Sequence, residues 1–261
     1  MEQKISVVIN TYNAEKNLRR VLESVKFFDE VLVCDMESTD NTLSIAREYD
    51  CHIVTFPKEN CSIVEPAREY AIHQVSNPWV LVVDADEVIS HQLRDYLYHH
   101  IQNETPAAGI KIPRKNRLMG HFMHGYYPDY NLRFFRQDVT TWPPVIHSQP
   151  QVKGRVICIP DSLKELAIDH LDDRSIKERL AKINLYTEYE LEKRRHCHYC
   201  VAAFFYRPLV RFLKCYLLKG GFRDGIYGVL FAWLESVQQF AILAKLYELK
   251  HPVVSNHDTK E

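Results

Sequence analysis

The sequence predicts an α/β protein with a mostly parallel central sheet flanked by helices, followed by a helical extension at the C-terminal end. Short apolar runs rich in β-branched residues alternate with amphipathic segments from the N-terminus onward. Strands that alternate with helices at short spacing need crossover connections, which give parallel pairing and cover both faces of the sheet. From Ser175 the pattern is helical almost to the end, with breaks at Pro208 and at Gly220 and Gly221.

Each predicted element has its own local signal. The β-branched run at residues 4–10 has the length of a buried strand, and apolar residues at helical spacing follow it. The polar cluster at residues 38–41 is typical of a turn and a helix N-cap. The strands are predicted at 4–10, 30–35, 52–56, 79–83 and 109–113, and the helices at 18–25, up to 49, after Pro66 and over 90–102. Residues 114–160 are irregular, with a short strand-like piece at 132–135.

Length, composition and charge narrow the classes of protein. The chain has 261 residues, 46% apolar and 26% charged residues, and a formal net charge of -1, values typical of an ordinary globular protein. There is no global basic surface that would favour a nucleic-acid partner. We predict two regions, a sheet domain at 1–165 and a helical region at 166–261. The N-terminus shows no secretory signal, and charges interrupt every apolar stretch, so the expected location is the cytoplasm.

The seven cysteines are irregularly spaced, which favours free thiols over a disulfide framework. Cys197 and Cys200 stand at the spacing that zinc sites use, with His196 and His198 beside them. A second pair of ligands is missing from the sequence, and the segment lies inside a helical pattern. We therefore do not expect a structural zinc site here.

Polar residues follow the predicted parallel strands where these strands end. Thr11, Tyr12 and Asn13 follow the first strand, Asp35 ends the second, and Asp84 and Asp86 end the fourth. Open α/β sheets bind ligands at the carboxyl ends of their strands, so these residues mark the expected site.

The sharpest signal is the sequence Asp84-Ala85-Asp86 directly after an apolar strand. Two carboxylates one residue apart can hold a divalent cation, and such a cation can bind a diphosphate and neutralise it as it leaves. An acidic surface turn that caps a helix is the alternative. Asp35 has two interpretations as well, since it could accept hydrogen bonds from a base or ribose while the residues after it cap a helix.

Four segments in this order and spacing resemble the family 2 inverting glycosyltransferases with the GT-A fold: SVVINTYNAEKNLRRVLESV, DEVLVCDMESTDNT, PAREYAI and WVLVVDADE. The resemblance is strongest over residues 4–90. It continues more loosely through YYPDYNLRFFR, at residues 126–136, and into the C-terminal helices. That longer match is similar to the subgroup of lipopolysaccharide core biosynthesis transferases.

The resemblance implies a role for each matching residue. Arg68 would lie near the nucleotide and diphosphate, and Asp84 would face the ribose or the sugar. Asp86 would hold Mg²⁺ or Mn²⁺ on the diphosphate. The nucleotide pocket would be lined by Thr11, Tyr12 and Glu15, with Asp35 on the uracil or ribose.

Inversion needs a base that takes the proton of the acceptor hydroxyl. The pair of acidic residues that commonly supplies it in the family is not evident here. Asp129, in a Tyr-Pro-Asp-Tyr segment, is the nearest candidate, although it could equally be a turn residue after Pro128. His147 matches a histidine that the subgroup often carries, which implies a metal ligand or an acceptor contact.

Residues 204–222 mix large apolar side chains with cations. Such a segment can lie in a membrane interface, which would suit a lipid-linked acceptor, or it can pack on the catalytic domain or on a second subunit. The sequence does not separate peripheral membrane contact from a homodimer.

The predicted function is therefore metal-dependent, inverting transfer of a sugar from a nucleotide-diphosphate donor, most simply UDP-linked, to a hydroxyl of a cell-envelope glycan such as lipopolysaccharide core. One alternative is a sugar nucleotidyltransferase, but the loop after the first strand lacks the glycines such an enzyme usually has. The other is an inactive scaffold that binds a nucleotide sugar.

Overall fold

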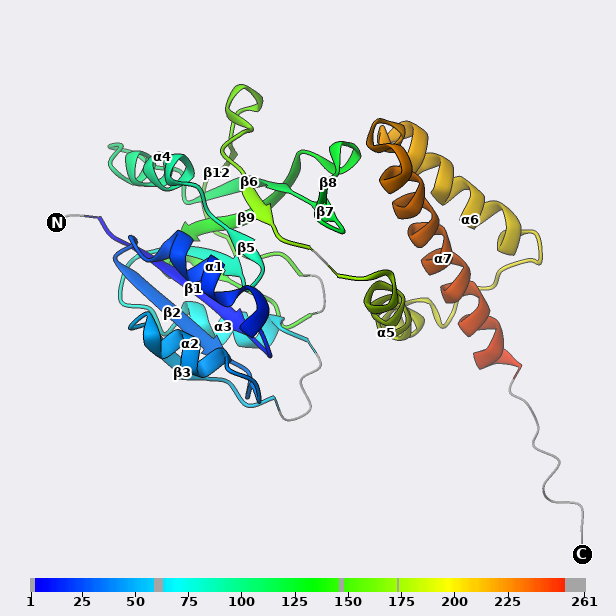
Figure 1. Ribbon diagram of the computed structural model, residues 1–261, viewed down its shortest axis with the longest axis horizontal. Coiled ribbons are helices and arrows are strands. Elements are labelled where there is room, and N and C mark those ends of the chain that lie inside the picture. Colours follow the sequence, from blue (N-terminus) through cyan, green and yellow to red (C-terminus); the bar gives the residue numbers. More distant parts are fainter. Residues whose placement is uncertain (1–2, 59–62, 146–147, 173, 252–261) are drawn as a thin grey trace, which may run out of the picture. The chain divides into compact units, whose positions relative to one another are not determined.

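The computed structural model describes residues 3–58, 63–145, 148–172 and 174–251 (Figure 1). The chain divides into two compact units. The sheet unit comprises Met1–Asn116 and Tyr127–Leu171, and the helical unit comprises Arg117–Tyr126 and Asp172–Glu261. The sheet continues past the predicted boundary at residue 165, because strand β13 (Ile168–His170) belongs to it.

The sheet unit is built on a mostly parallel sheet, which confirms the predicted fold class. Its main path runs in the order β3-β2-β1-β4-β9-β6-β13-β5, and β12 pairs with β6. Strands β1 to β4 are parallel to one another, whereas β9 is antiparallel to both β4 and β6. The remaining strand bounds are β1 (Ile5–Thr11), β2 (Glu30–Asp35), β3 (His52–Thr55), β4 (Trp79–Asp84), β5 (Glu87–Val88), β6 (Gly109–Lys115), β9 (Asp129–Arg136) and β12 (Val156–Cys158). A separate pair is formed by β10 (Thr140–Thr141) and β11 (Gln151–Val152).

Helices cover both faces of this sheet (Figure 1). On one face, α1 (Glu15–Val25), α2 (Thr42–Glu48) and α4 (His91–Ile101) bury apolar residues against the odd-numbered side chains of β1. On the other face, α3 (Glu65–Ile72) buries Ala67, Ala71 and Ile72 in a second cluster with Val8. Burial on both faces explains why these strands read as continuous apolar runs.

Strand β9 places two polar residues, Asp129 and Arg133, toward the carboxyl edge of the sheet. Leu81 of β4 pairs with Phe134, and Arg114 at the end of β6 pairs with Asp129. Since β9 is antiparallel to its neighbours, its first residues lie where β4 and β6 end. The predicted piece at 132–135 is therefore the centre of a strand that begins at Asp129.

The helical unit is formed mainly by α5 (Ile176–Arg194), α6 (Ala203–Leu213) and α7 (Gly225–Lys250) (Figure 1). A π-helical turn, η4 (Lys214–Leu218), and a 3-10 turn, η5 (Gly221–Asp224), connect α6 to α7. The turn requires glycine at position 228, since an added Cβ would lie 1.8 Å from the carbonyl oxygen of Gly221. The segment Arg117–Tyr126 contributes β7 (Arg117–Leu118), β8 (His121–Phe122) and the 3-10 turn η1 (His124–Tyr126) to this unit.

One helical stretch in the described residues, Gly221–Lys250, is long and apolar enough to cross a membrane by length and composition. Its best window has a mean hydropathy of 1.3 and is 28% buried. The expectation that charges interrupt every candidate is therefore wrong for this stretch, because its charged residues lie toward its ends and around Glu235.

Candidate functional site

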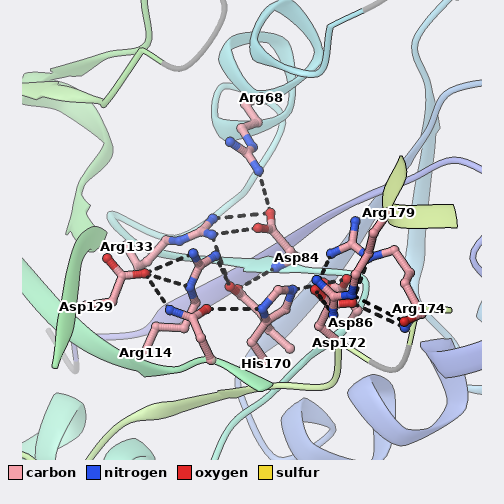
Figure 2. A network of polar contacts seen from close by, with 12 residues as sticks. Arg68, Asp84, Asp86, Arg114, Asp129, Arg133, His170, Asp172, Arg174 and Arg179 are labelled. Carbon is pink, nitrogen blue, oxygen red and sulfur yellow. Dashed lines mark hydrogen bonds and ion pairs between the residues drawn. The ribbon is translucent and has the colours of Figure 1, made fainter. Parts of the chain in front are cut away.

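The turn between β4 and β5 carries the two aspartates at the carboxyl edge of the sheet. Asp84 is held from two sides, by Arg68 of α3 and by Arg133 of β9 (Figure 2). Arg133 Nη2 lies 2.6 Å from Asp84 Oδ2, and Arg133 Nη1 lies 3.2 Å from Asp84 Oδ1. Glu87 closes the turn, because its Oε2 accepts the backbone N–H of Asp84 at 2.9 Å. Asp84 is thus fixed in position by cations from two other elements.

Glu87 extends this network into the protein interior. Its side chain is fully buried, and Oε1 lies 3.1 Å from Arg133 Nη2 and 3.4 Å from Arg114 Nη1. A buried carboxylate needs such partners to remain charged. Arg114 and Glu87 therefore belong to the same charge network as the predicted Asp84 and Arg68.

The ionisation of this network follows from its geometry. Burial alone would raise the pKa of Asp84, but the charges of Arg133 and Arg68 outweigh it and hold that pKa well below the usual range. For Arg133, burial lowers the pKa, but Asp84 and Glu87 raise it above its ordinary value. Both groups are charged at neutral pH, so Asp84 is a fixed anion between two guanidinium groups.

Asp86 belongs to a second chain of contacts at the same edge (Figure 2). Its Oδ2 lies 3.3 Å from Nε2 of His170, on β13. Nδ1 of His170 lies 3.2 Å from Oδ1 of Asn116, and Nδ2 of Asn116 donates to Asp129 Oδ2 at 2.9 Å. The polar chain Asp86–His170–Asn116–Asp129 thus connects the aspartate turn to the start of β9.

The direction of each hydrogen bond in this chain follows from the chemistry of its ends. An ionised carboxylate only accepts, so Asn116 turns its NH₂ group to Asp129 and its oxygen to His170. Nδ1 of His170 then donates to that oxygen, and Nε2 faces Asp86. The contact between Nε2 and the Asp86 oxygen, at 3.3 Å, suits either a proton on Nε2 or a metal cation bound by both atoms.

Asp129 is partly exposed and is held by Arg114 as well as by Asn116. Arg114 Nη2 and Nε lie 2.9 and 3.2 Å from Asp129 Oδ2. Burial raises the pKa of Asp129, but the Asn116 hydrogen bond and the charge of Arg114 outweigh it, and the net pKa is lower than usual. The group is therefore an ionised carboxylate that presents one oxygen with fewer partners than the other.

The loops after β1 and β2 form the other part of the edge. Asp35 is fully buried, and its carboxylate accepts hydrogen bonds from Thr11 Oγ1 at 2.8 Å and from the backbone N–H and Oγ of Ser38 at 2.8 and 2.6 Å. Thr11 pairs with Asp35 in the sheet, and its neighbour Asn10 pairs with Asp84. Thr11 therefore lies one strand away from the aspartate turn, and Asp35 lies two strands away.

Tyr12 and Glu15 lie on the outer side of these loops. The Tyr12 ring is 46% exposed, and Lys58 Nζ lies 3.3 Å from its centroid. Glu15 Oε2 accepts from the backbone N–H and the side chain of Asn41 at 3.0 and 2.8 Å. An exposed aromatic face beside a cation is suited to a nucleobase or a phosphate.

The structure brings most of the predicted site residues to one edge of the sheet, and it adds others. His147 lies outside the described residues. The residues that the sequence did not single out are Glu87, Arg114, Asn116 and His170. No group of three or more His, Cys, Asp or Glu side chains within the described part of the chain is arranged to hold a metal ion. A cation on Asp86 and His170 could take further oxygen ligands from a diphosphate or from water.

Comparisons with known proteins show the family and the fold. The sequence model of glycosyl transferase family 2 matches residues 6–152. The chain is 25% identical to the lipopolysaccharide core biosynthesis glycosyltransferase LpsC of Rhizobium meliloti, over 94% of this chain and 92% of that protein. It is 27% identical to an uncharacterised glycosyltransferase of Rickettsia typhi, over 95% of this chain and 88% of that protein.

A solved structure shows the same fold. It is that of the mannosyltransferase PcManGT from Pyrobaculum calidifontis in complex with GDP-Man and Mn²⁺, with a TM-score of 0.55 and 14% identity, over 96% of this chain and 88% of that chain. The match of the family model over more than half of the sequence, together with this GT-A architecture, decides the assignment. The chain belongs to glycosyl transferase family 2 and is a glycosyltransferase that uses a nucleotide-sugar donor.

Proposed function

We propose that the protein catalyses metal-dependent, inverting transfer of a sugar from a UDP-linked donor to a hydroxyl of a cell-envelope glycan such as lipopolysaccharide core. The observation that carries the proposal is the Asp86–His170 pair, a carboxylate oxygen and an imidazole nitrogen 3.3 Å apart beside a clamped Asp84. The resemblance to the lipopolysaccharide subgroup and the similarity to LpsC support the acceptor class.

Asp86 and His170 fit a Mg²⁺ or Mn²⁺ ion, because a carboxylate oxygen and an imidazole nitrogen that face each other at 3.3 Å are both suitable ligands. His170 is the metal ligand of this proposal, and the role of His147 as a metal ligand or an acceptor contact stays a prediction. When bound, the cation would neutralise the charge that builds on the departing nucleotide diphosphate. Arg68, which also contacts Asp84, adds a fixed positive charge near the same edge.

Asp129 is the proposed base. The acceptor oxygen forms a bond to the anomeric carbon, the bond from that carbon to the diphosphate breaks, and the hydroxyl proton passes to Asp129. Attack from the face opposite to the diphosphate inverts the anomeric centre, through an oxocarbenium-like transition state. Arg114 and Asn116 keep Asp129 ionised and hold one of its oxygens, so the carboxylate is ready to accept.

Thr11, Tyr12, Glu15 and Asp35 form the proposed nucleotide pocket. Asp35 uses its carboxylate for three internal hydrogen bonds, so its first role in this proposal is to hold the loops after β1 and β2 together. Its contact with the uracil or ribose remains a prediction. Tyr12 has the exposed ring that a nucleobase could stack on.

The test is calorimetric titration of the purified protein with UDP, GDP, CDP and ADP, each with and without Mn²⁺. We expect Mn²⁺-dependent binding of UDP, weakened about 10–100-fold or more in Asp86→Ala and His170→Ala. Asp138→Ala, an exposed aspartate at the far end of β9, is the matched control and should bind as wild type. Metal-independent binding would remove the metal from the proposal, and preference for another nucleotide would replace the donor. Binding without turnover of any sugar nucleotide would favour an inactive scaffold.

A further inference from the structure

We propose that the helical unit carries a surface that lies in the interface of an anionic membrane. This surface, the apolar-basic face, consists of exposed apolar residues of α6, η4 and α7 and the cations that flank them. Most of the large apolar side chains that the described residues expose belong to this unit. The inference does not depend on the proposed donor, metal or base.

Helix α6 supplies one continuous apolar strip. Phe205, Leu209 and Leu213 follow one another at i, i+4 and i+8, and they are 75%, 58% and 41% exposed. Tyr206 and Val210 lie next to them on the same side of the helix and are also exposed. The opposite side of α6 packs on α7, where Ser236 Oγ donates to the carbonyl oxygen of Pro208 at 2.8 Å.

Exposed apolar side chains also occur beyond α6 and on α7. Leu217, Leu218 and Phe222 are exposed in the connection, with Leu218 exposed at 83%. On α7, five of the six exposed large apolar residues recur at spacings of seven, four, three and seven, which places these five on one side of the helix, away from Leu249. They are Ile226, Trp233, Val237, Phe240 and Tyr247.

Cations flank the α6 and η4 part of this face, and one of them, Arg211, is paired with Glu235 of α7. The lysines and arginines between residues 195 and 234 are Arg195, Arg207, Arg211, Lys214, Lys219 and Arg223, and the acidic residue there is Asp224. Asp224 is buried and accepts the backbone N–H groups of His124 and Gly125 at 2.9 and 3.1 Å. It therefore offsets little of the positive charge at the surface. Cations that flank an apolar strip complement anionic lipid headgroups.

The same charge disfavours a second copy of the chain on this face. A two-fold dimer would bring the same cationic patch of each subunit to one interface. Anionic lipid supplies both an apolar layer and the opposite charge. Of the two alternatives that the sequence left open, contact with an anionic membrane is therefore favoured over a homodimer.

Contacts inside the unit favour a helix pair that lies on the membrane over one that spans it. Glu235, in the middle of α7, pairs with Arg211 of α6, and Lys245 pairs with Glu188 of α5. The polar side of α7 is thus packed on protein. If α7 spanned the membrane, its charged residues would be surrounded by lipid unless they stayed paired. A peripheral position exposes only the apolar strip to lipid.

Trp233 provides a direct measurement. The chain has three tryptophans, of which Trp79 and Trp142 are buried and Trp233 is 58% exposed. We expect the emission of the full-length protein to shift to shorter wavelength with phosphatidylglycerol-containing vesicles, and not with pure phosphatidylcholine vesicles. High salt should reverse the shift. Trp233→Phe should remove the shift while the protein still sediments with the vesicles.

Variants separate the two parts of the surface. Phe205→Gln and Leu209→Gln should each lower vesicle partitioning about tenfold or more, and Lys214→Glu and Arg223→Glu should each lower it at least about fivefold. Phe27→Gln and Lys153→Glu, exposed positions in the sheet unit, should partition as wild type. Nucleotide binding should stay unchanged in all six, so failure of this proposal is distinct from failure of the proposed function.

Four outcomes would overturn the proposal. The first is the absence of a shift with either type of vesicle. The second is a shift that grows with protein concentration in the absence of lipid, which would identify a second copy on the face. The third is short-wavelength emission of Trp233 in the dilute monomer, which would mean that the chain itself covers the face. The fourth is protein that resists both high salt and alkaline extraction, which would indicate a spanning helix.

Discussion

Asn116 contacts both the proposed metal ligand and the proposed base. Its amide nitrogen donates to Asp129 at 2.9 Å, and its oxygen lies 3.2 Å from His170 Nδ1. Partners behind a metal-ligating histidine fix its tautomer and ring orientation. A single side chain therefore orients both the His170 ring and the Asp129 carboxylate.

Two substitutions at Asn116 should separate these roles. Asn116→Ala removes both contacts, so Mn²⁺ affinity should fall about 10–100-fold and transfer should fall with it. Asn116→Asp keeps an acceptor for His170 but places a second negative charge beside Asp129. Mn²⁺ affinity should then stay near wild type while transfer falls, as measured by Mn²⁺ paramagnetic resonance and by product formation. If Mn²⁺ affinity and transfer fell equally in the two variants, the result would indicate only general structural damage. Asn103→Ala, in an exposed loop, is the control.

Asp129→Asn tests the base directly. Donor binding should remain near wild type, and transfer should fall about 10²-fold or more, since the amide cannot accept the proton. The lowered pKa of Asp129 means that the wild-type base is still ionised below the ordinary aspartate value of about 3.9. Transfer should therefore show no loss from this group between pH 8 and pH 5. Full activity of the variant would remove Asp129 from the site.

Asp84 makes a contribution to stability that depends on pH. Asp84→Asn leaves Arg68 and the buried Arg133 with one partner fewer, and the free energy of unfolding should fall by about 2–3 kcal/mol. Because the pKa of Asp84 is lower in the folded state, its stabilisation is present above about pH 4 and is lost as pH falls through the folded value. Urea melts at pH 7 and pH 3 should show the difference between wild type and variant shrinking in acid. A constant difference would contradict the assigned ionisation.

At the scale of elements, β9 lies between β4 and β6, is antiparallel to both, and supplies two residues to the site. Phe134 in its centre stacks on Trp79 of β4, with ring centroids 5.2 Å apart and an interplanar angle of 8°. This packing fixes the strand whose first residue is Asp129 and whose fifth is Arg133. The position of the proposed base is thus tied to the core.

Phe134→Leu should weaken that connection. The loss of the aromatic stack and the cavity it leaves should lower the free energy of unfolding by about 1–2 kcal/mol. Urea melts give the change, and Leu163→Ala, at an exposed position, should be close to neutral. Unchanged stability in Phe134→Leu would show that β9 is held mainly by its backbone pairing.

The polar cluster after β2 does more than begin a helix. Asp40 Oδ1 accepts the backbone N–H of Thr42 at 3.0 Å, which is a local turn contact at the start of α2. Ser38 Oγ and Thr42 Oγ1 also accept the backbone N–H groups of Asn13 and Ala14, at 2.9 and 2.8 Å. The cluster therefore holds the loop after β1, where the nucleotide is expected.

At the scale of the whole molecule, the thiols report on both units. Burial raises the pKa of the Cys34 thiol to about 12, and Cys215 is also buried, whereas Cys158, Cys197 and Cys200 are exposed. Alkylation of the native protein at pH 8 should label the three exposed cysteines rapidly and the two buried ones only after unfolding. Mass mapping gives the rate for each residue, and rapid labelling of Cys34 would contradict the packing of β2 against α3.

The division into units also separates the proposed activities. Every residue of the charge network and of the chain from Asp86 to Asp129 belongs to the sheet unit, and the apolar-basic face belongs to the helical unit. Variants in one unit should therefore leave the measured property of the other unchanged.

The sequence by itself determined the parallel α/β half, the placement of Asp84 and Asp86 at a strand end, and the family. These follow from local information, because apolar periodicity and strand-to-turn changes are encoded in neighbouring residues. The sequence also located the basic-aromatic segment, whose composition is local as well.

Only the tertiary structure decided which distant side chains meet. His170 reaches Asp86 across 84 residues, and Asn116 reaches it through His170, although no spacing in the sequence connects them. The antiparallel register of β9 places Asp129 beside Arg114, and a strand of mixed polar and apolar residues does not reveal its partners. Such contacts depend on strand order and register, which are set by packing over the whole sheet unit and not by local sequence.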